Sequence, residues 1–278
     1  MRGAVPESEW QRMRSPFQDG EFPFPVKYGY LNVGVVEEGP TALSGRTVFT
    51  LFPHQSAFVV PADAVIPVPD AVPPLRAVLA GAVETAVNVL WDAGPRLGDA
   101  VAVVGAGMIG SAIARLAAQI PGVEVTLVDI DPAKRSLAAE LGVSFAHPED
   151  VTRDYDIVIE ASGTGDGLAV ALRIAATDGE IVVASWYGSA PLQIELGADF
   201  HSRRLTLRSS QVGEVAQARR GRRSPRQRLE LALRLLEDDA FDNLLAGNSS
   251  WTNLPSVMAA LAEGSLGGLC HTIDWSES

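Results

Sequence analysis

The spacing of apolar residues along the 278-residue chain changes after about residue 70. Up to that point the sequence holds short β-branched runs separated by Pro and Gly, such as GRTVFTLF and SAFVVP, which predict short strands joined by turns. Between residues 72 and 91 the spacing becomes helical, with an apolar face made of Ala77, Leu79, Ala82, Val83, Val87 and Leu90. We therefore predict a β-rich first part followed by a buried helix or helix pair.

From residue 98 onward, apolar strand-like runs alternate with helical patterns. The runs are VAVV at 101–104, VTLV at 125–128, DIVIEA at 156–161, EIVVAS at 180–185 and LTLRSS at 205–210. Such alternation predicts an α/β fold, a doubly wound parallel sheet of the Rossmann type. We expect this α/β domain to span 98–213, and a discontinuous β-rich domain to be formed by 1–97 and 214–278.

Composition removes several classes of function. The formal net charge of −12 is unlike that of a protein that binds nucleic-acid backbones. Cys270 is the only cysteine, so an internal disulfide and a CxxC zinc site are both excluded. The sequence has no apolar run of the roughly 20 residues that cross a bilayer, and its N-terminus lacks the apolar core of a signal peptide. We expect a cytoplasmic protein that acts on a small molecule, without nucleic-acid or membrane partners.

A glycine-rich turn follows the first strand of the α/β part. Gly105, Gly107 and Gly110 form the pattern GxGxxG between VAVV and a helix with one apolar stripe. In this context the first glycine permits a tight turn, the second lets the backbone approach a pyrophosphate, and the third lets the helix lie close to the strand. Met108 and Ile109, at the start of that helix, are assigned to the same dinucleotide site.

Asp129 ends the second strand, 129 − 110 = 19 residues after the third glycine. A carboxylate there accepts hydrogen bonds from the adenine ribose and opposes a 2′-phosphate, which favours NAD(H) over NADP(H). Ile130 and Arg135 are assigned to the same pocket. Two other interpretations are open: the glycines form only a packing turn while Asp129 or Asp131 caps a helix, or the site binds S-adenosylmethionine in a methyltransferase.

Further candidates lie where later strands end. Parallel strands place their carboxyl ends at one edge of a sheet, which is where doubly wound folds bind ligands. The candidate cofactor-binding residues there are Ala161, Ser162, Gly163, Ser185, Trp186 and Tyr187, with plain turns as the alternative.

Two charged features receive a structural interpretation. Six arginines between Arg219 and Arg228 are interpreted as a solvated surface, because charge runs are usually exposed. Glu84 lies within an apolar helix, where an unpaired carboxylate is costly, so we predict that it has a partner.

Taken in order, several segments resemble the medium-chain dehydrogenase/reductase superfamily, the relatives of zinc alcohol dehydrogenases. The segments that carry the resemblance are PVKYGYLNVGVVEEG, HQSAFVVPADAVIPVPD, ETAVNVLWDAGPRLGDAVAVVGAGMIG, VTLVDIDPAKRSLAAELG and RRLTLRSS. Within the superfamily they are most similar to a bacterial branch described as zinc-type or threonine-dehydrogenase-like. The resemblance implies a GroES-like substrate domain beside the Rossmann domain, and a homo-oligomer, either a dimer or a tetramer.

The chain departs from this family at its metal ligands and its length. Gly29, Tyr30 and Leu31 stand where zinc-dependent members have Gly-His-Glu, and Gly81 stands near another ligand position. The four-cysteine structural zinc lobe is missing as well. We therefore expect no metal site, and an activity like that of the zinc-free members, which reduce quinones or activated double bonds. The family also has several tens more residues before PVKYGY, so we expect either a misplaced start or a true loss of the first strands.

Without a metal, protein groups must polarise the substrate, and Tyr30 and His54 are the catalytic candidates. For each, a purely structural role is the alternative. We predict a zinc-independent, NAD(P)(H)-dependent oxidoreductase that moves hydride between nicotinamide and a carbonyl, an alcohol or an activated alkene. A dinucleotide-binding sensor or assembly subunit without turnover is the alternative function.

Overall fold

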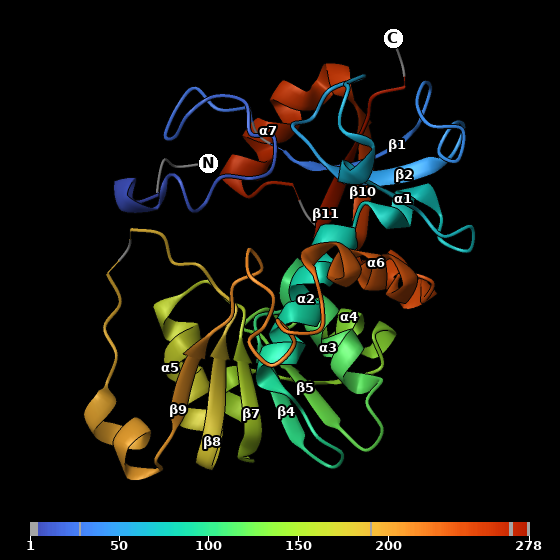
Figure 1. Ribbon diagram of the computed structural model, residues 1–278. Coiled ribbons are helices and arrows are strands. Elements are labelled where there is room, and N and C mark those ends of the chain that lie inside the picture. The colour runs from blue at the N-terminus through green and yellow to red at the C-terminus, as the bar shows by residue number, and fades with distance from the viewer. Residues whose placement is uncertain (1–4, 28, 190, 267–268, 277–278) are drawn as a thin grey trace. The chain divides into compact units, whose positions relative to one another are not determined.

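The computed structural model describes residues 5–27, 29–189, 191–266 and 269–276, which form two compact units (Figure 1). The first unit comprises Met1–Gly81, Gly188–Ala190 and Leu233–Ser278, and the second comprises Ala82–Tyr187 and Pro191–Ala232. The domain boundaries expected from the sequence, at residues 98 and 213, stay a prediction.

The second unit is built on a six-stranded parallel sheet. Its strands run in the order β6 (Ser144–Ala146), β5 (Glu124–Val128), β4 (Ala100–Val104), β7 (Tyr155–Glu160), β8 (Ala175–Val183) and β9 (Thr206–Ser209). The predicted α/β fold class and its five strands are confirmed. The sequence pattern missed β6, because that strand has three residues and none of them is buried.

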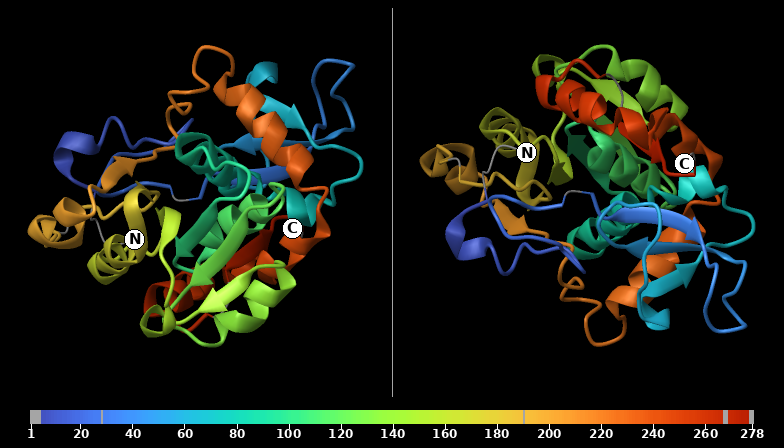
Figure 2. Two further views of the ribbon diagram at one scale, coloured as in Figure 1. Left: turned by 90° about the horizontal axis from the view of Figure 1, so that it is seen from below. Right: turned by 90° about the horizontal axis from the view of Figure 1, so that it is seen from above.

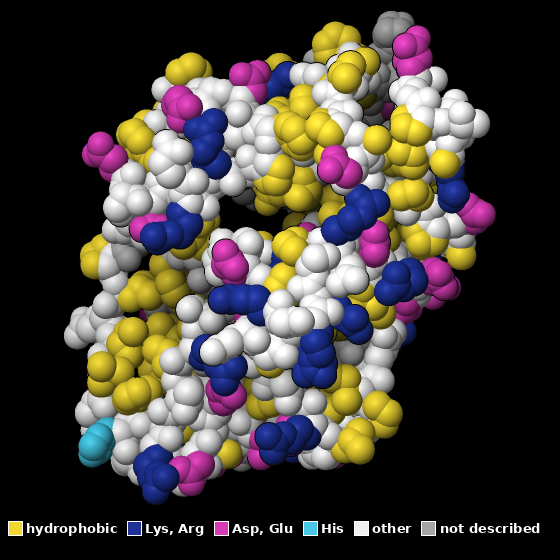
Figure 3. All heavy atoms as spheres, viewed as in Figure 1, with side chains coloured by type: hydrophobic (Ala, Val, Ile, Leu, Met, Phe, Trp, Pro, Cys, Tyr) yellow, Lys and Arg dark blue, Asp and Glu magenta, His cyan; other side chains and the backbone are white. Residues whose placement is uncertain are grey.

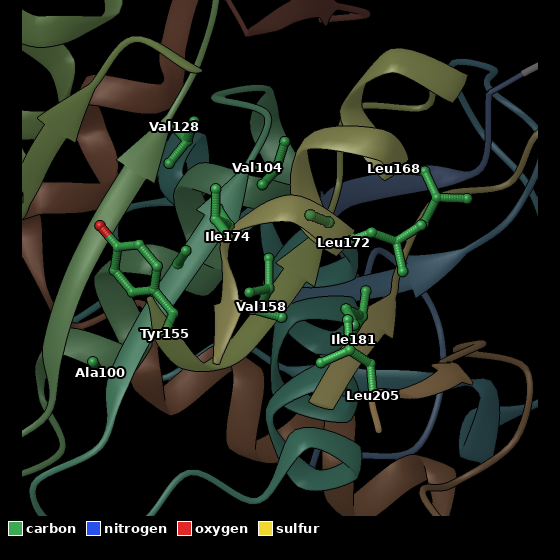
Figure 4. Close-up of a cluster of buried hydrophobic side chains, with 13 residues drawn as sticks. Ala100, Val104, Val128, Tyr155, Val158, Leu168, Leu172, Ile174, Ile181 and Leu205 are labelled. Carbon is green, nitrogen blue, oxygen red and sulfur yellow. The ribbon is translucent and has the colours of Figure 1, made fainter. Parts of the chain in front are cut away.

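Helices cover both faces of this sheet (Figures 1 and 2). Helix α3 (Met108–Ala118) packs on β4 and β5, α4 (Lys134–Glu140) packs on β6, and α5 (Gly165–Ile174) packs on β4, β7 and β8. Right-handed crossovers place α3 and α5 on opposite faces, since the chain moves in opposite directions from β4 and from β7. Under α5, Leu168 and Leu172 meet Val158 and Ile181 of the sheet (Figure 4).

The first unit holds two small sheets. Strands β1 (Leu31–Val35), β2 (Thr47–Leu51) and β3 (Val65–Pro67) pair antiparallel, and β10 (Leu245–Ser250) pairs parallel with β11 (Cys270–Asp274). The β-rich N-terminal part is thus confirmed.

The remaining helices include the predicted pair. This pair is α1 (Pro74–Ala77) and α2 (Ala80–Ala93), and it is followed later in the chain by α6 (Pro225–Leu235) and α7 (Leu254–Glu263). Shorter helical turns are Glu7–Glu9, Ala62–Ala64, Pro148–Asp150, Leu196–Phe200, Asp239–Leu244 and Trp251–Asn253. Among the described residues, no helix has the length and apolar character needed to cross a membrane.

A buried arginine ties two distant segments of the first unit together. Arg76 of α1 donates from Nε and Nη2 to the two carboxylate oxygens of Asp242, each at 2.7 Å. Its Nη1 donates to the carbonyl oxygens of Leu236 and Glu237 at 3.2 and 3.3 Å. This bidentate pair fixes the segment that follows α6 against α1.

Candidate functional site

Two of the three glycines in the predicted turn are required by packing. Gly105 has φ +105°, and a Cβ atom there would lie 2.7 Å from the backbone N and Cα of Ser162. A Cβ atom on Gly110 would lie 1.9 Å from the carbonyl oxygen of Gly105. Both positions therefore exclude side chains, one because of the turn and the adjacent strand end, the other because α3 lies close to the turn.

Gly107 differs from the other two. It is exposed, its φ of −74° suits any residue, and a Cβ atom there would meet nothing within 4 Å. Gly107 is also the N-cap residue of α3, and no side chain caps that helix end. The positive end of the helix dipole therefore faces open space beside a residue with no side chain, an arrangement suited to an anionic group. Met108 and Ile109 form the partly exposed first turn.

Asp129 is bonded directly to the glycine-rich turn. Its Oδ2 accepts from the backbone N–H of Ala106 at 2.6 Å, and its Oδ1 accepts from the N–H of Asp131 at 2.9 Å. A carboxylate has about four acceptor directions, so both oxygens keep capacity for ligand hydroxyls. Asp131 accepts from the N–H of Ala133 at 2.9 Å in the turn before α4; the N-cap residue of α4 is Ala133, and no side chain caps that helix end.

The two neighbours of Asp129 assigned to the cofactor are both exposed. The side chain of Ile130 is 76% exposed directly after β5. The guanidinium of Arg135 lies 4.8 Å from the centre of the Phe145 ring, as a cation–π pair.

The ends of β7 and β8 are joined by hydrogen bonds. The N–H of Gly163 donates to Ser185 Oγ at 2.8 Å, and Ser162 Oγ lies 3.0 Å from Thr164 Oγ1. Ala161 N–H donates to the carbonyl oxygen of Val104, at the end of β4. The structure thus brings the predicted residues of these strand ends together at the carboxyl edge of the sheet, beside the glycine-rich turn.

A buried carboxylate at this edge was not among the sequence candidates. Glu160, the last residue of β7, is fully buried; its Oε1 accepts from Ser162 N and Oγ at 2.7 and 2.5 Å. Its Oε2 accepts from Tyr187 Oη at 2.5 Å. The sequence feature that could have indicated Glu160 is an acidic residue at the end of an otherwise apolar strand.

Burial, together with the hydrogen bond to Glu160, raises the pKa of Tyr187 far above its ordinary value. Tyr187 therefore stays protonated at neutral pH and acts as a donor to Glu160. Trp186, between Ser185 and Tyr187, is half exposed.

The two catalytic candidates lie in the first unit. Tyr30 is 48% exposed, and its carbonyl oxygen accepts from Phe52 N–H just before β1. His54 Nε2 lies 3.2 Å from the carbonyl oxygen of Leu31, and its ring fills the space that a side chain on Gly29 would need. Burial lowers the pKa of His54, partly opposed by the hydrogen bond to Leu31, so the imidazole is neutral at pH 7.

The expected partner of Glu84 is Arg228, whose Nε donates to Glu84 Oε1 at 3.0 Å. The surface interpretation is therefore wrong for Arg228, which is only 2% exposed because it pairs with a carboxylate inside the unit. The interpretation is confirmed for the other arginines of the run, Arg219, Arg220, Arg222, Arg223 and Arg226. Figure 3 shows Lys and Arg side chains on the face formed by α6 and the loop before it.

The donor atoms needed for a zinc ion do not fit the positions that the resemblance indicates. A Cβ atom on Gly81 would lie 2.5 Å from Leu31 Cδ2, so two expected ligand positions are taken by an apolar contact. Across the described part of the chain, no group of three or more His, Cys, Asp or Glu side chains could hold a metal ion.

Comparison with known proteins agrees with this architecture. Residues 108–237 match the family model described as zinc-binding dehydrogenase. Galactitol-1-phosphate dehydrogenase from Escherichia coli is 16% identical, with a TM-score of 0.74 over 95% of this chain and 88% of that one.

Two further solved structures carry nicotinamide cofactors. A protein described as a zinc-binding dehydrogenase from Sinorhizobium meliloti 1021, bound to NADP, is 18% identical, with a TM-score of 0.67 over 82% of this chain and 78% of that one. A short chain alcohol dehydrogenase from Escherichia coli CFT073, complexed with NADH, is 17% identical, with a TM-score of 0.65 over 84% of this chain and 78% of that one. At these identities the likeness is one of fold. The match to the zinc-binding dehydrogenase family thus covers residues 108–237, and the solved dehydrogenases share the fold of this chain.

Proposed function

We propose that the chain binds NAD(H) at the glycine-rich turn and moves hydride between the nicotinamide and a carbonyl, an alcohol or an activated alkene. The observation that carries this proposal is the contrast between Gly107 and its two neighbours in the motif. Packing accounts for Gly105 and Gly110, whereas nothing in the described chain occupies the space beside Gly107. A turn selected for packing alone has no need of a third glycine at that exposed position.

The residues at the carboxyl edge hold the parts of the cofactor. The first turn of α3 binds the pyrophosphate through backbone N–H groups, and Asp129 accepts from the hydroxyls of the adenine ribose. Ser162, Gly163 and Ser185 line the same edge and orient the remainder. When bound, the nicotinamide supplies the hydride or accepts it.

Protein groups supply the proton chemistry of this proposed reaction. Tyr30 donates a hydrogen bond to the oxygen that gains negative charge, and a neutral His54 is available to hold or pass a proton. Tyr187 is unsuited to that role, because its hydroxyl already donates to the buried Glu160 carboxylate. We propose that these groups act in place of a zinc ion, since Gly81 and Leu31 offer no ligand atoms.

The Asp129 carboxylate supports a preference for NAD(H), since a 2′-phosphate placed there would meet a negative charge. We expect Asp129→Ala to weaken NADH binding about tenfold and to reduce discrimination against NADPH, measured by fluorescence titration of both cofactors. Unchanged affinities for both would show that Asp129 serves only the local turn.

The test of the proposed function compares the purified chain with Gly107→Val. Gly34→Val is the matched control, because Gly34 also has open space around it and no left-handed backbone. Neither change meets a steric conflict, so thermal midpoints should stay close to that of the unchanged protein. We expect saturable NADH binding by the unchanged chain and by Gly34→Val, and at least tenfold weaker binding by Gly107→Val.

The possible outcomes separate the candidate functions. Absence of NADH and NADPH binding by a folded, unchanged chain would refute the proposal. Equal affinity of Gly107→Val and the control would remove its main support. Tight binding without turnover over a broad panel of carbonyls, alcohols and activated alkenes would favour the sensor or assembly subunit.

A further inference from the structure

A buried ionic cluster of the second unit lies outside the contacts described for the cofactor. Arg228 of α6 is 2% exposed, and Glu84 and Asn88 of α2 are 7% and 1% exposed. The Arg228 guanidinium donates from Nε to Glu84 Oε1 at 3.0 Å and from Nη1 to Asn88 Oδ1 at 2.5 Å. One charged side chain from α6 is thus enclosed by two polar side chains one helical turn apart on α2.

The same cluster holds the backbone of residues 211–216, here named the anchored loop. Arg228 Nη1 donates to the carbonyl oxygen of Glu214 at 3.1 Å, and Nη2 donates to that of Val212 at 2.5 Å. Asn88 Nδ2 donates to the carbonyl oxygen of Gln211 at 3.4 Å, while Asn88 Oδ1 accepts from Ala216 N–H at 2.9 Å. Four backbone groups of six consecutive residues are therefore fixed by two side chains.

The anchored loop begins at the carboxyl edge of the sheet. It follows β9, and Ser210 N–H donates to the carbonyl oxygen of Val183, the last residue of β8, at 2.9 Å. From Val183 the chain continues to Ser185 and Tyr187, at the edge where the cofactor is proposed to bind. Gln211, Gly213 and Glu214 are exposed. The loop therefore presents a polar face to solvent, while its carbonyl groups accept hydrogen bonds from the buried cluster.

The chemistry of the cluster suits positioning better than stability alone. A buried ion pair is costly to desolvate, and apolar residues of similar volume often stabilise a fold as well. A guanidinium, however, carries five donors in a fixed plane and can satisfy several acceptors at set directions, which an ammonium or an apolar side chain cannot do. Here those donors bond one carboxylate, one side-chain amide and two backbone carbonyls. The geometry of the loop therefore depends on this one side chain.

We propose that Arg228, supported by Glu84 and Asn88, is a positioning residue that fixes the anchored loop as a wall of the cofactor site. The inference rests on the proposed function, because the loop has a ligand to position only if a dinucleotide binds at this edge. Arg228 acts through the backbone of the anchored loop. Its side chain is buried beneath that loop, so it does not itself touch the cofactor.

The test compares Arg228→Lys with Arg76→Lys. Arg76 is a matched control, because it is also a buried arginine that bonds one carboxylate and two carbonyl oxygens, in the first unit. Both variants keep the charge and lose the planar set of donors, so both should unfold at lower temperature. We expect NADH affinity to fall at least tenfold in Arg228→Lys and to change less than twofold in Arg76→Lys.

Amide hydrogen exchange supplies the readout that a general loss of stability would not move. Exchange at residues 212–216 should become faster in Arg228→Lys and stay unchanged in Arg76→Lys. If Arg228→Lys fails to fold, Asn88→Ala replaces it, because that change frees the loop at Gln211 and Ala216 and leaves the pair of Arg228 with Glu84 in place.

Two outcomes would overturn the inference, and they are distinguishable. If the unchanged chain binds NADH and Arg228→Lys, or Asn88→Ala in its place, binds it equally well, the cluster is structural only. If the unchanged chain binds neither NADH nor NADPH, the proposed function fails, and the positioning role fails with it.

Discussion

Buried carboxylates in the second unit are satisfied in two different ways. Glu160 is surrounded by hydroxyl and backbone donors, whereas Glu84 is paired with a guanidinium. The need for a partner at Glu84 could be predicted from its place in an apolar helix. The identity of that partner could not, because Arg228 lies 144 residues further along the chain. Glu160 and Tyr187 meet for a similar reason, through strand pairing that no local pattern encodes.

The Tyr187 hydroxyl should contribute measurably to stability through Glu160. Tyr187→Phe removes a donor from a fully buried carboxylate, and we expect a loss of about 1–3 kcal/mol in the free energy of unfolding. Denaturant unfolding measures it. In a Glu160→Gln background the same substitution should cost less, because the acceptor is no longer charged. An equal cost in both backgrounds would mean that the hydroxyl acts elsewhere.

His54 should make the stability of the protein depend on pH. Its pKa in the folded state is lowered below the value of 6.5 that the unfolded chain has, so the unfolded state binds protons first as the pH falls. Stability is therefore fully present above 6.5 and is lost as the pH falls toward the lowered pKa. We expect His54→Gln to flatten this part of the profile, measured by urea unfolding at pH values on either side of 6.5. Parallel profiles for the two proteins would contradict the buried, neutral histidine.

At the scale of elements, the sequence was most informative where a motif and a period coincide. The strand before Gly105, the helix after Gly107 and the strand that ends at Asp129 could all be predicted, because apolar periodicity and a glycine turn point to the same unit. The short edge strand β6 could not, since it is held by pairing with β5 and has little burial of its own. The conformation of the anchored loop could not be predicted from the sequence either, because it is fixed by side chains on α2 and α6.

The close approach of α3 to the glycine-rich turn predicts an effect on stability alone. Gly110→Ala places a Cβ atom 1.9 Å from the carbonyl oxygen of Gly105, so the helix has to move. Overpacking of this kind costs about 1–3 kcal/mol in the free energy of unfolding. Gly107→Ala meets no neighbouring atom and should cost only about 0.5–1 kcal/mol, because Ala is a weaker N-cap residue than Gly. Denaturant unfolding of the two variants should separate them, and equal costs would contradict the packing role assigned to Gly110.

At the scale of the whole molecule, the order of segments resembles that of the medium-chain dehydrogenase/reductase superfamily, and the fold is that of solved dehydrogenases. The sequence also indicated that the chain departs from its zinc-dependent relatives, because a missing ligand is a local feature that can be read directly. It could not show what takes the place of the ligands. In the structure Gly81 and Leu31 pack together, and the ring of His54 occupies the space beside Gly29.

These contacts lead to a prediction about the metal content of the whole chain. Zinc in proteins is held by Cys, His and acidic side chains, usually in a tetrahedral set. Tyr30, Leu31 and Gly81 offer no such set, and Cys270 is half-buried with its pKa raised by burial, which opposes the thiolate that zinc requires. We expect elemental analysis of the purified protein to find well below one zinc per chain, and NADH affinity to be unchanged by a chelator. A stoichiometric zinc that survives dialysis would mean that another set of donors forms the site, and the metal would then polarise the substrate oxygen in place of Tyr30.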